Sequence, residues 1–285
     1  MTAVFDDRRC ELGEGPLWHP GRNQLFWFDI LGKRLLTRTV AGARDWPFAE
    51  LVSAAGWVDD HSLLIASETA LFRYDLDKGA RSDLCALEAD RPDTRSNDGR
   101  ADPQGGFWIG TMGKRAEPAA GAIYRWFRGE LRRLFPGISI PNSICFAPDG
   151  RTAHFSDSAR RQVMRVALDG DGWPAGMPEV FLDLTGGAPE PDGAVVDASG
   201  LLWLAEWNGA GVSAFAPDGT KLRHVPVAAA QSSCPAFGGA GLSTLFVTSA
   251  LQGLTAAARQ AEPQGGMTFA ISGAARGQAE HRVIL

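Results

Sequence analysis

The sequence lacks long apolar runs and an excess of basic charge. No apolar stretch in its 285 residues approaches the ~18 residues of a membrane-spanning helix. Its 28 Lys and Arg are outnumbered by 33 Asp and Glu, which gives a net charge of −5. A nucleic-acid-binding domain would instead concentrate basic residues on one face. We therefore expect neither a membrane nor a nucleic acid as a partner.

Cysteine and histidine are too scattered for a structural zinc site. The four Cys form no C-x-x-C pair, and no Cys/His cluster is present. Cys145 and Cys234 are expected to be small buried thiols, and the redox state of all four Cys stays open. The N-terminus carries Asp6-Asp7-Arg8-Arg9 and no apolar core, so we expect no signal peptide and a cytoplasmic protein.

Sustained helical periodicity is also lacking, and one short helical turn is expected at 253–260. Instead, one pattern recurs: a short apolar strand, a polar turn with Gly or Pro, and a second apolar strand. The clearest copy is 191–207. The turns align on Pro20, Asp59, Pro103, Pro148, Ala198 and Gly238, at intervals of 39, 44, 45, 50 and 40 residues.

These intervals match the roughly 40–50 residues of one propeller blade. The sequence therefore predicts an all-β fold: a six-bladed β-propeller with four-stranded antiparallel blades. One domain would occupy residues 1–285. Residues 3–5 are expected to add a strand to the last blade, which would cover an exposed sheet edge. The nine Trp and 15 Phe are expected to pack between blades.

Six residues before each aligned turn, every blade carries a polar residue. We call these the ring positions, and they are Glu14, Ser53, Asn97, Asn142, Asp192 and Ser232. If the strand that they begin is innermost, all six gather at one mouth of the central channel. Four of them offer carboxylate or amide oxygens, which are the ligands of hard cations. The competing interpretation is that such residues belong to turns or to a water-filled channel, and Asp98-Gly99 is read as a turn.

Alternation along an extended strand places Arg95 and Asn97 on one side, and Ser96 and Asp98 on the other. The channel mouth is therefore expected to hold Glu14, Asn142 and Asp192 around an ion, with Arg95 and Asn97 beside it. Such an oxygen set suits Ca²⁺, Mg²⁺ or Mn²⁺ and leaves catalytic Zn²⁺ or Fe²⁺ open. The two Ser at ring positions have no evident His partner, which argues against a serine hydrolase.

At these residues the sequence resembles the gluconolactonase/regucalcin (senescence marker protein) family, of the bacterial sugar lactonase type. The resemblance spans nearly the whole chain in order. Its motifs are Leu-Gly-Glu-Gly-Pro-Leu-Trp at 12–18, Arg-Ser-Asn-Asp-Gly-Arg at 95–100, Gly-Thr-Met at 110–112, Pro-Asn-Ser-Ile at 141–144, Pro-Asp-Gly at 191–193, Leu-Trp-Leu-Ala at 202–205, Phe-Gly-Gly at 237–239 and Val-Thr-Ser at 247–249.

The resemblance implies a six-bladed propeller with one divalent cation, Ca²⁺ being our first expectation. It implies Glu14, Asn142 and Asp192 as ligands, with Asp192 also as general base. Arg95 and Asn97 would hold sugar hydroxyls. The family often places an acidic residue shortly after Gly-Thr-Met, whereas this chain reads Gly-Lys-Arg-Ala-Glu at 113–117. Either Glu117 reaches back to the substrate, or Lys114 or Arg115 replaces it.

The resulting functional prediction is metal-dependent hydrolysis of a sugar lactone to its aldonic acid. Gluconolactone, xylonolactone and arabinonolactone are the types considered. The cation would polarise the carbonyl while Asp192 acts as general base. Two alternatives are an esterase or phosphotriesterase that uses the same site, and a non-catalytic calcium-binding propeller. We expect a monomer or a weak homo-oligomer, with a small-molecule sugar lactone as the partner.

Overall fold

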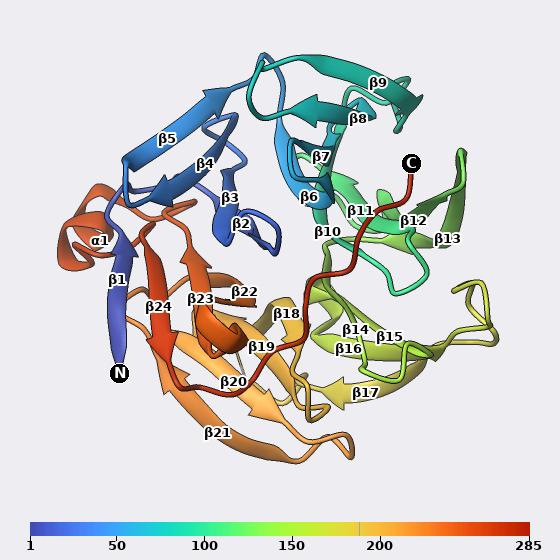
Figure 1. The fold of residues 1–285 in the computed structure, drawn as a ribbon. Helices are drawn as coiled ribbons and strands as arrows, with labels where there is room; N and C mark the ends of the chain where they lie inside the picture. The colour runs from blue at the N-terminus through green and yellow to red at the C-terminus, as the bar shows by residue number, and fades with distance from the viewer. Residues whose placement is uncertain (188) are drawn as a thin grey trace.

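Six sheets surround a central channel in the computed structural model, which describes residues 1–187 and 189–285 (Figure 1). Each sheet has four antiparallel strands, so the predicted six-bladed propeller is confirmed. Blades one to three comprise β2 (Gly13–His19), β3 (Gln24–Asp29), β4 (Arg34–Thr39) and β5 (Gly42–Pro47); β6 (Val52–Asp59), β7 (Ser62–Ser67), β8 (Ala70–Asp75) and β9 (Arg81–Ala86); and β10 (Thr94–Ala101), β11 (Phe107–Gly113), β12 (Gly121–Phe127) and β13 (Glu130–Ile138).

The remaining blades repeat this order from the innermost strand outward. They comprise β14 (Pro141–Phe146), β15 (Thr152–Asp157), β16 (Gln162–Ala167) and β17 (Glu179–Asp183); β18 (Glu190–Val196), β19 (Leu202–Trp207), β20 (Gly211–Phe215) and β21 (Lys221–Pro226); and β22 (Ser232–Gly238), β23 (Thr244–Ser249), β24 (Thr268–Ser272) and β1 (Thr2–Asp6).

The N-terminal strand β1 closes the circle, as the sequence predicted. It pairs antiparallel with β24, and Val4 lies opposite Phe269. The edge of β24 is thereby covered by backbone hydrogen bonds. The helices are short: η1 (Ser158–Arg160), η2 (Ala240–Leu242) and α1 (Ala256–Ala261), the last of which overlaps the stretch 253–260 where a helical turn was expected. No helix of residues 1–187 and 189–285 has the length and apolarity to cross a membrane.

The hydrophobic core is divided among the interfaces between neighbouring blades. Trp108 of blade three meets Phe146 of blade four edge to face, with ring centroids 5.5 Å apart. Trp203 of blade five meets Phe237 of blade six in the same way at 5.9 Å. Such aromatic pairs bury large apolar areas in a defined geometry. The expected packing of Trp and Phe between blades is therefore confirmed.

The innermost strands carry a β-bulge at or beside each ring position. The pairing of β14 with β15 skips from Asn142 to Cys145, and that of β18 with β19 skips from Pro191 to Ala194. Corresponding shifts occur in the other four blades. A bulge adds an unpaired residue and redirects the side chains around it. Simple alternation therefore fails at the positions that form the channel mouth.

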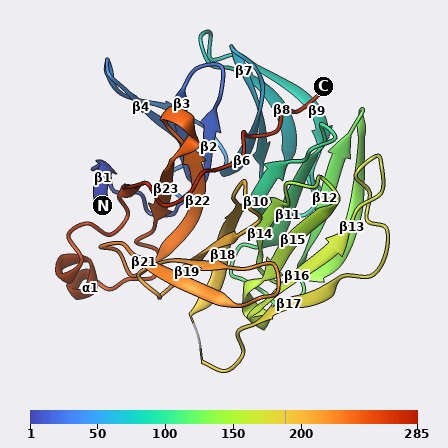
Figure 2. The same ribbon diagram turned by 60° about the horizontal axis from the view of Figure 1, so that its bottom comes forward.

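The C-terminal segment 276–285 crosses the other mouth of the channel (Figures 1 and 2). Gln278 Nε2 donates to the carbonyl oxygens of Phe146 at 3.1 Å and Val196 at 2.9 Å. These two residues end the inner strands β14 and β18, which lie side by side. Glu280 forms a buried ion pair with Arg100 at 2.5 Å. The segment thus covers the mouth opposite the ring positions.

Candidate metal and active site

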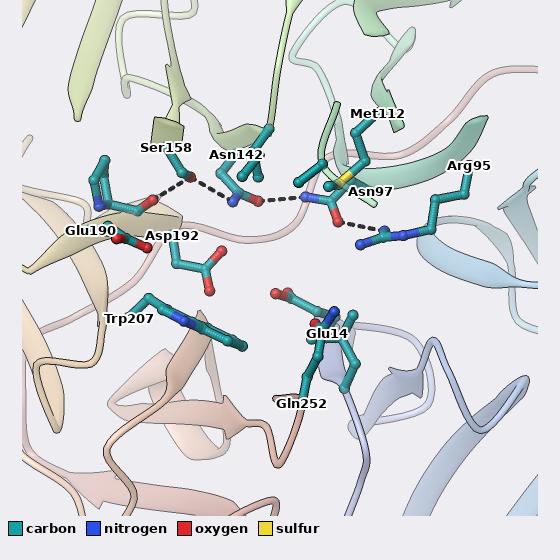
Figure 3. A pocket seen from close by; sticks show the side chains of 14 residues that line it. Glu14, Arg95, Asn97, Met112, Asn142, Ser158, Glu190, Asp192, Trp207 and Gln252 are labelled. Carbon is teal, nitrogen blue, oxygen red and sulfur yellow. Dashed lines mark hydrogen bonds between the residues drawn. The ribbon is translucent and has the colours of Figure 1, made fainter. Parts of the chain in front are cut away.

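Four of the six ring positions line one cavity of about 200 Å³ where the inner strands begin. These are Glu14 on β2, Asn97 on β10, Asn142 on β14 and Asp192 on β18, and Arg95 on β10 lies beside them (Figure 3). The cavity is smaller than the roughly 300–1,000 Å³ of pockets for drug-sized ligands. The cavity therefore suits a small ligand that contains a single five- or six-membered ring. The structure brings all three predicted ligands together with Arg95 and Asn97.

The two Ser at the remaining ring positions are buried and bonded within the protein. Ser53 Oγ donates to Ser96 Oγ at 2.8 Å, and Ser232 Oγ donates to the carbonyl oxygen of Ala229 at 3.4 Å. Neither residue belongs to the wall of the 200 Å³ cavity. The chemistry of the mouth therefore falls to blades one, three, four and five.

A directed chain of hydrogen bonds fixes the amide groups (Figure 3). Arg95 Nη1 donates to Asn97 Oδ1 at 2.7 Å, and Asn97 Nδ2 donates to Asn142 Oδ1 at 2.9 Å. Asn142 Nδ2 in turn donates to Ser158 Oγ at 2.9 Å, and Ser158 Oγ donates to the carbonyl of Pro191 at 2.5 Å. Asn97 Nδ2 also donates to the carbonyl oxygen of Pro141 at 2.9 Å. The Asn142 amide oxygen keeps a second lone pair for another partner.

The two carboxylates of Glu14 and Asp192 face each other across the cavity (Figure 3). Burial, followed by the charge of Asp98, raises the pKa of Glu14 above its usual range. Burial also raises the pKa of Asp192, and the charges of Glu14, Asp98 and Glu190 add to the shift. The nearby Arg95 offsets only part of this repulsion. Two desolvated carboxylates so close together favour a cation between them.

Arg95 is the cationic residue of the cavity wall. Burial lowers the pKa of its guanidinium to about 10, while the charges of Glu14 and Asp192 act in the opposite direction. The side chain therefore stays protonated at neutral pH. Its Nη1 is engaged by Asn97 and by the carbonyl of Ser96 at 2.9 Å.

The donor chemistry fits a hard divalent cation. Glu14 and Asp192 supply carboxylate oxygens and Asn142 supplies an amide oxygen, which are the ligand types of Ca²⁺ and related ions. Across the described ranges 1–187 and 189–285, no three His, Cys, Asp or Glu side chains gather as a metal site. The Asn142 amide oxygen, which lies outside that residue set, is the predicted third ligand.

The segment after β11 does not carry Glu117 to the cavity. Ala116 belongs to the cavity wall, whereas Glu117 Oε1 accepts from Arg115 Nε at 2.9 Å and Glu117 Oε2 accepts from the Arg115 backbone N–H at 3.0 Å. Lys114 pairs with Glu68 at 2.5 Å. The predicted substrate contact through Glu117, Lys114 or Arg115 has no counterpart in this geometry, because the tight loop pairs these charges with other partners.

Three polar or aromatic wall residues were not predicted from the sequence: Ser158, Trp207 and Gln252. Trp207 ends β19, and the other two follow β15 and β23. Each therefore stands where the second strand of a blade returns to the mouth at which the first strand began. Antiparallel pairing makes this return inevitable, so the ends of the second strands were the available signal.

Asp98 does not lie in a turn, and that prediction is wrong. It is a buried residue of β10, with 5% of its surface exposed, and its Oδ2 accepts the backbone N–H of Ile144 at 2.7 Å. Burial raises the pKa of Asp98 to about 6. The β10 bulge explains the error, because the register shift between Ser96 and Gly99 accommodates Asp98 within the strand. The Asp-Gly pairs at 149–150 and 218–219, by contrast, lie in turns.

The His and Cys residues stay outside the candidate site. His154 packs edge to face on Phe181 with ring centroids 5.0 Å apart. His19 is the buried last residue of β2, and its Nε2 lies 3.0 Å from the carbonyl oxygen of Asp59. Cys145 and Cys234 are buried as predicted, and all four Cys are free thiols.

Comparison with known proteins places this geometry in a family. Residues 12–251 match the SMP-30/Gluconolactonase/LRE-like region. The chain belongs to this family. An L-arabinolactonase of Azospirillum brasilense is 37% identical over 94% of this chain and 91% of its own. A pentonolactonase of Haloferax volcanii is 34% identical, with 88% and 85% covered.

A solved structure of the SMP-30/gluconolactonase family is also very similar. It is described as a calcium-binding protein, regucalcin, from Agrobacterium tumefaciens, and is 41% identical. The TM-score is 0.97, and the match covers 99% of this chain and 97% of the other. These relatives support lactone hydrolysis as the family chemistry.

Proposed function

We propose that the protein hydrolyses a small sugar lactone to its aldonic acid with the help of one divalent cation. The observation that carries this proposal is the buried oxygen set of Glu14, Asn142 and Asp192, with Arg95 and Asn97 in the same small cavity. Lactonases named among the relatives support the reaction class. Aldonolactones of pentoses and of glucose are the candidate substrates.

Glu14, Asn142 and Asp192 would hold the cation. Ca²⁺ is our first choice because the ligands are hard oxygens and a close structural relative is described as calcium-binding. Zn²⁺, Mn²⁺, Mg²⁺ and Fe²⁺ are the alternatives. When bound, such an ion supplies Lewis-acid polarisation of the lactone carbonyl.

Asp192 is the proposed general base. Its carboxylate accepts a proton from the water whose oxygen attacks the carbonyl carbon. The ring C–O bond then breaks, and the same proton passes to the ring oxygen, which becomes the new hydroxyl of the aldonic acid. Without the ion, burial and the charge of Glu14 raise the pKa of Asp192. A cation on both carboxylates would lower this pKa and keep Asp192 ionised and ready to accept the proton.

Arg95 and Asn97 are the proposed substrate-orienting residues. Since Arg95 Nη1 is engaged by Asn97, its remaining N–H groups would donate to substrate oxygens. A planar guanidinium can make two parallel hydrogen bonds to neighbouring oxygens. The hydrogen-bond chain from Arg95 to Pro191 would keep the site rigid during the reaction, which favours a fixed substrate orientation.

The first test is proton release from five- and six-membered aldonolactones in a weakly buffered assay. Chelated protein would be compared with protein to which one divalent metal at a time is added back. We expect fast hydrolysis that depends on the metal, and the rates would rank the sugars and the ions. No acceleration over spontaneous hydrolysis under any metal would overturn the proposal.

A second candidate is a calcium-binding protein without catalysis, favoured by the description of the regucalcin structure. Calorimetric titration with Ca²⁺ separates the two. Tight binding without turnover of any lactone would select this second function. Faster turnover of aryl esters or phosphotriesters than of aldonolactones would instead select a different hydrolase on the same site.

A further inference from the structure

The cavity wall holds one charged residue that the proposed reaction does not use. Its charged members are Glu14, Arg95, Glu190 and Asp192. Glu190 opens β18, and it lies on the same side of the cavity as Asp192 (Figure 3). The wall therefore carries three carboxylates and one guanidinium. A divalent cation on Glu14 and Asp192 would bring its formal charge to zero.

Glu190 is held in place from a second blade. Its Oε1 lies 3.0 Å from Arg161 Nη2, and the two side chains are 39% and 35% exposed, respectively. Arg161 follows η1, the segment that also carries Ser158, and its carbonyl accepts the N–H of Leu184 at 2.9 Å. The pair thus bridges blades four and five at the rim of the cavity. It leaves the charge of Arg161 balanced by Glu190.

We propose that Glu190 restricts the enzyme to lactones whose tail is uncharged. This inference rests on the proposed lactonase function and adds the substrate class. A hydroxyl on the tail can donate to the Glu190 carboxylate. Glu190 belongs to the cavity wall, whereas Arg161 pairs with it from outside the lining residues. A carboxylate, phosphate or sulfonate on the tail would therefore meet the Glu190 carboxylate first, with Arg161 already engaged by Glu190. Specificity of this kind comes from a repulsive element in the site as well as from attractive contacts.

The test compares two lactones that differ only in tail charge. The γ-lactones of gluconic and glucaric acid carry a hydroxymethyl group and a carboxylate, respectively, at the terminal carbon. We expect the wild type to prefer the gluconic lactone in kcat/KM. In Glu190→Gln, which keeps the shape but removes the charge, we expect the relative kcat/KM for the glucaric lactone to rise by about tenfold.

The matched control is Glu179→Gln. Glu179 forms an ion pair with Arg165 at 2.6 Å on the outside of blade four, where the two side chains are 65% and 40% exposed. We expect this variant to keep the wild-type preference. Added salt should weaken the wild-type preference and change that of Glu190→Gln less, because screening acts on the charge that the variant lacks.

The outcomes separate the two proposals. If neither lactone is hydrolysed with any metal, the lactonase function itself is wrong. If the gluconic lactone is hydrolysed but Glu190→Gln leaves the preference unchanged, only the role of Glu190 is wrong. Equal wild-type rates on both lactones would overturn it in the same way. Unchanged thermal unfolding of Glu190→Gln would show that the comparison concerns folded protein.

Discussion

Asp192 stands among groups that act on its proton affinity in opposite directions. Burial and the charges of Glu14, Asp98 and Glu190 raise its pKa, whereas Arg95 lowers it. A carboxylate in such surroundings takes up a proton more readily than one in water. The proton affinity of the proposed general base is therefore set by neighbours on two other inner strands, β2 and β10, and by Glu190 on its own strand β18.

Asp192→Asn should reduce kcat by about 10²–10⁴ at saturating metal, because an amide cannot accept the proton of the attacking water. The measurement is lactone turnover together with the metal content of the same sample. Asp183→Asn, on an exposed residue at the end of β17, should keep wild-type turnover. Wild-type turnover by metal-loaded Asp192→Asn would remove Asp192 from the mechanism.

His154 provides a separate test at this scale, through stability. Burial lowers the pKa of His154 to about 4, below the ~6.5 expected in the unfolded chain. The unfolded state therefore binds the proton first. The stability that this residue contributes is complete above about pH 6.5 and is lost as the pH falls towards 4. Over that range the loss is on the order of 3 kcal/mol.

His154→Phe removes the titrating group and keeps an aromatic ring against Phe181. We expect the variant to gain stability relative to wild type as the pH falls from 7 to 4, measured by urea unfolding at each pH. The other acid-sensitive groups are common to both proteins, so the difference isolates His154. A difference that stays constant with pH would contradict the prediction.

Among the elements, the inner strands were predictable in position but not in local geometry. Turn residues at regular intervals located all six, because tight turns need Gly, Pro, Asn or Asp. The bulges have no comparable signal: Asp98-Gly99 has the residues of a turn, yet lies in β10. The sequence therefore identified Glu14, Asn97, Asn142 and Asp192 as one group and misplaced Asp98.

Residues at the ends of the second strands show a second limit of prediction from the sequence. Trp207 and Ser158 reach the cavity only through the return of β19 and β15 to the mouth, a tertiary relationship that spacing along one strand does not reveal. Glu117 lies outside the cavity for a local reason. The side chain of Arg115, two residues before it, is close enough to pair with Glu117.

The bulge of β14 is held by a neighbouring strand. Ser143, directly after Asn142, adopts a left-handed conformation with φ of 57°, and the next backbone N–H, of Ile144, donates to Asp98 at 2.7 Å. Ser143 Oγ donates to the carbonyl of Asp192 at 2.5 Å. A non-glycine residue keeps such a conformation only where its surroundings enforce it. Asp98 is thus a positioning residue for Asn142.

Asp98→Ala should weaken metal affinity by roughly 10–100-fold, the usual effect of losing a group that orients a ligand. Titration calorimetry with Ca²⁺ measures this without relying on turnover. Asp98→Asn should recover part of the affinity, because its amide oxygen can still accept the N–H of Ile144. Equal affinity in wild type and Asp98→Ala would show that the bulge holds its shape alone.

For the whole molecule, the C-terminal segment ties together three consecutive blades at the mouth opposite the ring positions. Glu280 reaches Arg100 on blade three, while Gln278 bonds blades four and five. The Arg100 and Glu280 side chains are only 10% and 6% exposed. A buried cation needs a partner, so this pair couples the segment to the propeller.

Glu280→Gln should destabilise the protein by about 3–5 kcal/mol, because Arg100 is left buried without a countercharge. Unfolding in guanidinium chloride measures the change. Glu179→Gln, which opens the exposed pair with Arg165, should cost only about 0–1 kcal/mol. Equally small losses in both variants would mean that water reaches Arg100 and replaces Glu280.

The C-terminal segment also determines the route by which a ligand can enter and leave the channel. Only about 20 Å³ of space remains between Arg100, Phe146 and residues 278–281 at that end of the channel, which is room for about one water and far less than the cavity of about 200 Å³ at the other mouth. The channel is therefore closed to a sugar-sized molecule at this end. If the protein is the proposed lactonase, the aldonic acid would leave through the same opening by which the next lactone enters. We therefore expect the product to inhibit competitively. The longer a product molecule stays bound, the more its accumulation should lower the rate of hydrolysis.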